Sequence, residues 1–161
     1  MKNLKTGLLA ASVAAAFAIP LAVQAQAHDH GKHMMVQPAD LKWSDVPSLP
    51  AGAKITVVQG PMSEAVPFTA RIKLPANYSL PAHWHPAIEH VTVISGTFNM
   101  GTGEKLDRAQ TTALTPGAMA IMQVGTRHFA WTNEETIVQV HGNGPWAVNY
   151  VNPDDDPRKK K

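Results

Sequence analysis

The chain has 161 residues, enough for one ordinary domain and too few for two comfortable ones. It contains no cysteine, which excludes disulfides, a thiol nucleophile and a thiolate metal site. The formal net charge is +2, and it falls to about 0 if residues 1–27 are removed, because that stretch holds two lysines and no acid. This balance indicates no nucleic-acid partner.

Residues 1–27 have the form of a secretory signal peptide. Lys2 and Lys5 precede an apolar run from Leu8 to about Leu21, and small residues follow it. The run is shorter than the roughly 20 residues that a membrane-spanning helix needs, so we expect cleavage and no membrane contact afterwards. Cuts after residue 25 or after residue 27 both satisfy the small-x-small rule. The mature protein is predicted to be secreted or periplasmic.

The segment HDHGKH, residues 28–33, directly follows the predicted cut. The third residue of the mature chain is His30 if cleavage follows Ala27, and His28 if it follows Ala25. A free amine, two backbone amides and a third-position imidazole can wrap a square-planar Cu²⁺ or Ni²⁺ ion. His28 and His30 are therefore a candidate second metal site. The alternative is a polar terminus whose histidines bind nothing.

Residues 28–52 lack a lasting period and are predicted to form an N-terminal arm, whereas residues 53–151 are expected to form the domain. Short runs of β-branched, aromatic and apolar residues, separated by turn residues, indicate an all-β sandwich or barrel without long helices. The runs cover residues 54–60, 67–74, 89–96, 97–101, 111–114, 118–124, 128–132, 136–142 and 146–151. Residues 152–161 carry an acidic and then a basic run, which predicts a charged, disordered tail.

The stretch HWHPAIEH, residues 83–90, concentrates three histidines and a glutamate. Side chains at i and i+2 of a strand share a face, so His83 and His85 can reach one ion. Glu89 would open the next strand and face the same interior, and this places His90 on the opposite face. The alternative is that the two strand histidines merely face solvent.

A further ligand is offered by His128, which follows a turn at Gly125 and opens an apolar run. In a closed barrel a single inward imidazole from this run could meet the first cluster. Three imidazoles and one carboxylate form a donor set for one divalent transition metal, namely Fe, Mn, Ni, Co, Cu or Zn. Such a set leaves one or two coordination positions for water or substrate.

These residues resemble the two motifs of the cupin superfamily. His83, His85, Glu89 and Gly96 match the intervals of the first motif, with Asn77 in place of its first glycine. The second motif resembles residues 117–132, with Gln123 where proline is usual and Thr132 where asparagine is usual. The resemblance implies a single-domain cupin-like β-barrel, also described as a double-stranded β-helix or jelly roll. It implies that His83, His85, Glu89 and His128 hold one metal inside, and it suggests a homodimer formed through edge strands.

Several other side chains are candidates for the wall of a substrate pocket. Phe98, Met100, Met122 and Gln139 are candidate pocket residues, with ordinary core or strand surface as the alternative. Gln139 and His141 share one strand face, and His141 is the candidate catalytic proton carrier.

Two functions are compatible with these residues, because a fold does not determine a function. The first is a metal-dependent enzyme, of the dioxygenase or the Lewis-acid lyase or isomerase type, acting on a small oxygenated molecule. The second is a non-catalytic protein that binds or senses a small molecule or a metal ion. Arg71 and Arg127 are the only plausible partners for a substrate carboxylate in the motif region.

Overall fold

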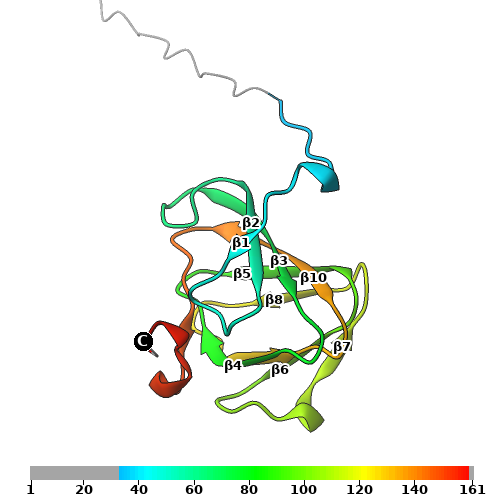
Figure 1. Cartoon of the computed structure of the whole chain (residues 1–161). Helices are drawn as coiled ribbons and strands as arrows, with labels where there is room; N and C mark the ends of the chain where they lie inside the picture. The colour runs from blue at the N-terminus through cyan, green and yellow to red at the C-terminus, as the bar shows by residue number, and fades with distance from the viewer. Residues whose placement is uncertain (1–32, 160–161) are drawn as a thin grey trace, which may run out of the picture. The chain divides into compact units, whose positions relative to one another are not determined.

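The computed structural model describes residues 33–159, whose regular secondary structure consists mainly of antiparallel strands in two facing sheets (Figure 1). The first sheet has the order β1-β2-β3-β10-β5-β8 and the second the order β11-β4-β9-β6-β7. The first sheet contains β1 (Ser44–Asp45), β2 (Lys54–Gln59), β3 (Pro67–Leu74), β10 (Thr136–Asn143), β5 (Glu89–Ser95) and β8 (Met119–Met122). The second contains β11 (Asn149–Tyr150), β4 (Ser79–Trp84), β9 (His128–Trp131), β6 (Phe98–Thr102) and β7 (Thr112–Leu114). The all-β prediction is confirmed.

Short 3-10 turns are the only helical elements within residues 33–159. They are η1 (Pro38–Asp40), η2 (Arg108–Gln110), η3 (Pro153–Asp155) and η4 (Pro157–Lys159). None of these turns is long and apolar enough to cross a membrane.

The core lies between the two sheets because the central strands alternate strictly. In β3 every second residue from Phe68 to Leu74 is buried, and in β10 Val138 and Val140 are buried while their neighbours are half-exposed. In β5 the buried positions are Glu89, Val91 and Val93. This period of two directs one face of each strand into the barrel, and it brings a carboxylate into an otherwise apolar layer.

Strand β4 was not among the predicted runs, because Pro81 interrupts its short apolar stretch and the polar residues Ser79 and His83 flank that stretch. Leu80 and His83 both line the interior although they are three residues apart, which a regular strand does not allow. The pairing of β4 with β9 shifts register between these two residues, as a bulge requires. The bulge turns His83 inward. The predicted run 146–151 is instead a strand only at Asn149–Tyr150.

The N-terminal arm contributes to the domain, so the predicted boundary at residue 53 is wrong. Leu49 is buried in the hydrophobic core, and Tyr78 donates a hydrogen bond from its hydroxyl to the carbonyl of Pro50, at 2.6 Å. Strand β1 pairs with β2. This segment joins the domain, although its sequence has no period, because the burial of Leu49 in the core stabilises it there.

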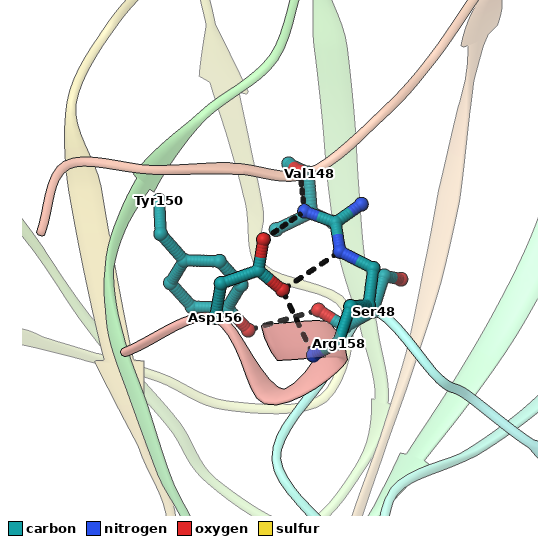
Figure 2. A network of polar contacts seen from close by, with 5 residues as sticks. All are labelled: Ser48, Val148, Tyr150, Asp156 and Arg158. Carbon is teal, nitrogen blue, oxygen red and sulfur yellow. Dashed lines mark hydrogen bonds and ion pairs between the residues drawn. The ribbon is translucent and has the colours of Figure 1, made fainter. Parts of the chain in front are cut away.

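The prediction of a disordered tail is also wrong for residues 152–159, which form η3 and η4 against the barrel. Figure 2 shows the contacts. The guanidinium of Arg158 donates hydrogen bonds to both carboxylate oxygens of Asp156, at 2.7 and 2.8 Å, and to the carbonyl of Val148, at 2.9 Å. The hydroxyl of Tyr150 donates to the carbonyl of Ser48, at 2.9 Å. Opposite charges close together in the sequence therefore pair locally instead of remaining solvated.

Candidate metal centre

The structure brings His83, His85, Glu89 and His128 together inside the barrel. His83 lies near the end of β4 and His85 just beyond it, whereas Glu89 and His128 are the first residues of β5 and β9. All four side chains are buried. The centroids of the three imidazole rings lie 4.3 to 5.1 Å apart, and the ligand atoms of the histidines lie within 4.8 Å of one another.

Backbone carbonyls orient all three rings in the same way. The Nδ1 atom of His83 lies 2.8 Å from the carbonyl of Pro81 and that of His128 lies 2.9 Å from the carbonyl of Thr126. The Nδ1 atom of His85 lies 2.8 Å from the carbonyl of Ala147. A carbonyl only accepts hydrogen bonds, so each Nδ1 carries the proton and each Nε2 keeps its lone pair. A hydrogen bond from one ring nitrogen to a carbonyl is typical of histidines that bind a metal through the other ring nitrogen.

The carboxylate of Glu89 meets two of these lone pairs. Its oxygens lie 3.3 Å from Nε2 of His85 and 3.4 Å from Nε2 of His128. Nε2 of His85 is buried and has no hydrogen-bond partner. Lone pairs that face a carboxylate at this distance repel it unless a proton or a metal cation lies between them. The donor set therefore fits a bound transition metal, although the identity of the metal is not determined by it.

Burial and repulsion from the neighbouring rings favour the neutral form of His83, which is the form that binds a metal. Burial, helped by the nearby His128 and His85, lowers the pKa of His83 to about 3. Burial opposes ionisation of Glu89, but His85 and His128 outweigh it and hold the pKa of that carboxyl well below its usual value. At neutral pH the site thus presents one carboxylate and an uncharged His83.

The four polar side chains lie in a small cavity whose other walls are apolar. Its volume is about 30 Å³, on the scale of an ion with one or two waters. The apolar wall residues are Leu49, Ile72, Leu74, Leu80, Val91, Phe98, Met100, Ala130, Val138, Val140, Trp146 and Val148. No lysine or arginine is among the described residues that line it. A ligand with a strong negative charge would find no counter-ion here except the metal.

The candidate pocket residues have different positions. Phe98 and Met100 lie on the cavity wall. Met122 is paired with Glu89 across β5 and β8 and packs against the core, but it is not among the residues that line the cavity.

For Gln139 and His141 the predicted pocket position is wrong. Both alternate with the buried Val138 and Val140 and therefore face outward. Gln139 accepts a hydrogen bond from Arg71, at 3.2 Å, and His141 stacks on His90. Strand parity, which correctly turned His90 away from the cluster, turns His141 away as well, because the two are direct partners across β5 and β10.

The two arginines considered as substrate partners are also directed elsewhere. Arg71 lies on the outer face with Gln139, and Arg127 forms an exposed ion pair with Glu104. The proposed amino-terminal site at His28 and His30 lies outside the described residues.

Sequence reasoning missed Trp146. Its ring stacks on that of His85, with centroids 4.4 Å apart and planes inclined by 16°, and it lines the cavity. The preceding Gly144–Pro145 peptide bond is cis, and the segment belongs to no strand. No periodic pattern predicts that the ring of Trp146 reaches the cavity, although the Gly-Pro pair before it indicates a turn.

Local backbone geometry explains the departures from the motifs. Asn77 has a positive φ of 57°, a conformation that asparagine tolerates best after glycine, so the substitution keeps the turn. Thr132 is buried and donates from its hydroxyl to the carbonyl of Pro75, at 2.7 Å. Gly125, with φ of 74°, donates its amide to the carbonyl of His85, which ties the two motifs together.

The comparisons with known proteins agree with this geometry. The family model described as the ChrR cupin-like domain matches residues 31–147. The chain belongs to this family. The cupin resemblance and the cupin-like barrel are thereby confirmed. No curated protein sequence matches the chain.

Solved structures show the same fold at low sequence identity. The polyketide cyclase RemF from Streptomyces resistomycificus is 19% identical with a TM-score of 0.65, covering 80% of this chain and 92% of the other. A putative acetylacetone dioxygenase from Methylibium petroleiphilum is 19% identical with a TM-score of 0.59, covering 78% and 85%. A chain from the complex of Rhodobacter sphaeroides SigE with the anti-sigma ChrR is 15% identical with a TM-score of 0.51, covering 66% and 51%. At these identities the likeness concerns the fold alone.

Proposed function

We propose that the protein is an exported metal-dependent enzyme that acts on a small, uncharged, oxygen-bearing molecule. One observation carries the proposal: a buried set of three lone-pair nitrogens and a carboxylate lies in a cavity whose remaining walls are apolar. His83, His85, Glu89 and His128 would hold the metal. The structural relatives include both a dioxygenase and a cyclase by name, so the fold is compatible with oxygen chemistry and with Lewis-acid chemistry.

The bound metal would supply Lewis acidity or oxygen activation at its open positions. The chain's own residues do the rest. Glu89 provides the single negative charge against the ion, and the carbonyls of Pro81, Thr126 and Ala147 keep the imidazoles in one tautomer. The apolar walls, including Phe98, exclude bulk water and strengthen the electrostatic interactions inside.

The walls also restrict the substrate class. Because no basic side chain among the described residues lines the cavity, a carboxylate or phosphate substrate would lose its hydration and gain no partner other than the metal. The cavity of about 30 Å³ must widen to admit a small diketone, phenol or similar neutral molecule, whose oxygen would then face the metal and whose carbon skeleton would face apolar residues such as Val91, Met100 and Val138.

Metal analysis followed by turnover assays tests this function. Protein purified without chelators should contain about one Fe, Mn, Ni, Co, Cu or Zn ion per chain. Oxygen uptake and product formation should then be measured over neutral diketones and phenols, and over their carboxylated analogues. We expect turnover of the neutral set and its loss in Glu89→Gln, with Arg71→Gln as the matched control. Preferential turnover of the anionic set would contradict the proposed substrate class.

A second candidate function is non-catalytic binding or sensing, and the small volume of the cavity favours it. A protein of this kind would hold one metal ion per chain in the site and turn over neither the neutral nor the anionic set. Ligand-dependent changes in the fluorescence of Trp146 without product formation would identify it.

Export is part of the proposal and rests on the form of residues 1–27. Amino-terminal sequencing of the protein recovered from the periplasm or medium should show a start at residue 26 or 28. An intact amino terminus in the cytoplasmic fraction alone would contradict it.

A further inference from the structure

A second group of histidines lies outside the barrel, on the face of β5 and β10 that points away from the cavity. His90 and His141 are direct partners in the strand register. Their rings stack with centroids 4.8 Å apart and planes inclined by 11°. Both side chains are half-buried in a surface cleft that also includes Thr69, Ile88 and Asn143. They contribute nothing to the wall of the inner cavity.

One ring nitrogen of each histidine in this pair is unsatisfied. The Nδ1 atom of each ring is buried and has no hydrogen-bond partner among the described residues. In the inner cluster, by contrast, a carbonyl accepts from every Nδ1. Two adjacent half-buried imidazoles without protein partners are costly unless something binds them both.

We propose that His90 and His141 form a second transition-metal site that takes a divalent ion such as Zn²⁺ or Cu²⁺ from solvent. Directly opposed strand residues hold their Cβ atoms roughly 4.5 to 5.5 Å apart, which suits two ligands of one ion. The ring spacing of 4.8 Å falls within the 4.3 to 5.1 Å range of the inner imidazoles, but the outer planes are inclined by only 11°, so one ring must turn about its side-chain bonds for both lone pairs to reach one ion.

The donor chemistry limits which ions this outer pair selects. Neutral imidazoles suit Zn²⁺, Cu²⁺ and Ni²⁺, whereas Mg²⁺ and Ca²⁺ require oxygen ligands. No carboxylate is among the described residues that line the cleft. Because the cleft is open to solvent, water completes the coordination, and the ion exchanges readily. This inference does not depend on the proposed enzymatic function.

Equilibrium dialysis with Zn²⁺ tests the proposal. The mature chain would be used with His28, His30 and His33 replaced by glutamine, so that the amino terminus does not compete. We expect a second, weaker class of binding site that holds one Zn²⁺ per chain in addition to the inner ion. In His90→Gln and in His141→Gln the dissociation constant of this class should rise by about 100-fold, because a lone imidazole loses the effective concentration of its neighbour. Thr92→Gln, on the same face of β5, is the matched control and should keep it.

The inner and outer sites are distinguished by crossing the variants. The His128→Ala variant should lose the inner ion and still bind Zn²⁺ at the weaker class of site. An unchanged number of ions and unchanged affinities in the His90→Gln/His141→Gln double variant would overturn the proposal. Histidine modification by diethyl pyrocarbonate, mapped by mass spectrometry, provides a test on the unsubstituted chain. Zn²⁺ should protect His90 and His141 together, and equal modification with and without Zn²⁺ would also overturn it.

Discussion

The histidines inside the barrel and the pair outside it have similar ring spacings but different surroundings. Inside, His83, His85 and His128 are buried and each donates from Nδ1 to a carbonyl, so their lone pairs are fixed before any ion arrives. Outside, His90 and His141 are held by strand register and stacking alone. Preorganisation, more than the number of histidines, should therefore separate a tight site from an exchangeable one.

The largest expected effect is the loss of the inner ion in His128→Ala. A bound ion stabilises only the folded state, so metal added at about 1,000 times its dissociation constant should contribute about 4 kcal/mol to the parent. This gain should vanish in His128→Ala and persist in His90→Gln. Thermal unfolding with and without metal, together with metal analysis, measures it. Unchanged metal loading in His128→Ala would show that the assumed ligand set is wrong.

The pH dependence of the metal-free protein should be of similar size. The pKa of His83 is about 3 in the folded chain and about 6.5 when unfolded, so the unfolded state binds the extra proton between these values. Stability should therefore fall as the pH drops from about 6.5 to about 3, by at most about 5 kcal/mol from this residue. The lowered pKa of Glu89 acts in the same direction at the acidic end, because the unfolded carboxyl takes up its proton first.

Denaturant unfolding in chelator at a series of pH values checks this dependence. His83→Gln should flatten the slope between pH 6.5 and 4, whereas His90→Gln should leave it largely in place. A slope that is the same in the parent and in His83→Gln would mean that the fold does not hold His83 neutral.

An intermediate effect is expected for Arg158→Ala. Arg158 bonds the carbonyl of Val148, and the adjacent carbonyl of Ala147 accepts from Nδ1 of His85. Removing the guanidinium should lower the Tm by roughly 4 °C and weaken binding of the inner ion severalfold, without affecting the outer pair. Lys159→Ala, which changes the exposed neighbour, is the control. Equal metal affinity in the two variants would show that the tail does not position His85.

The smallest effect is expected for Arg71→Gln on the outer face. Arg71 contacts Gln139 and does not line the cavity. Unfolding free energy should change by less than about 0.5 kcal/mol, and metal content and turnover should stay at the parent level. A marked rise in KM would return Arg71 to the substrate site and contradict its outward placement.

Local patterns in the sequence were sufficient for much of the fold and of the inner cluster. Alternation predicted β3, β5 and β10 and grouped His83, His85 and Glu89, because a period of two decides which side chains can share a face. His128 was selected by its place after the turn at Gly125 and by the cupin resemblance. The same rule of alternation placed His90 outside. It was not applied to the pairing of β10 with β5, so His141 was assigned to the pocket although its partner in register is His90.

Long-range packing decided the rest. The bulge before His83, the burial of Leu49 from the predicted arm, the stacking of Trp146 on His85 and the folding of the tail onto Val148 involve segments far apart in the chain or without a period. Such contacts form where volume and hydrogen-bond partners match across the assembled barrel, which no local pattern encodes. Residue type and spacing were enough to identify the side chains that could ligate a metal. That their lone pairs meet in an apolar cavity, and that two other histidines meet outside it, follows from the assembled barrel.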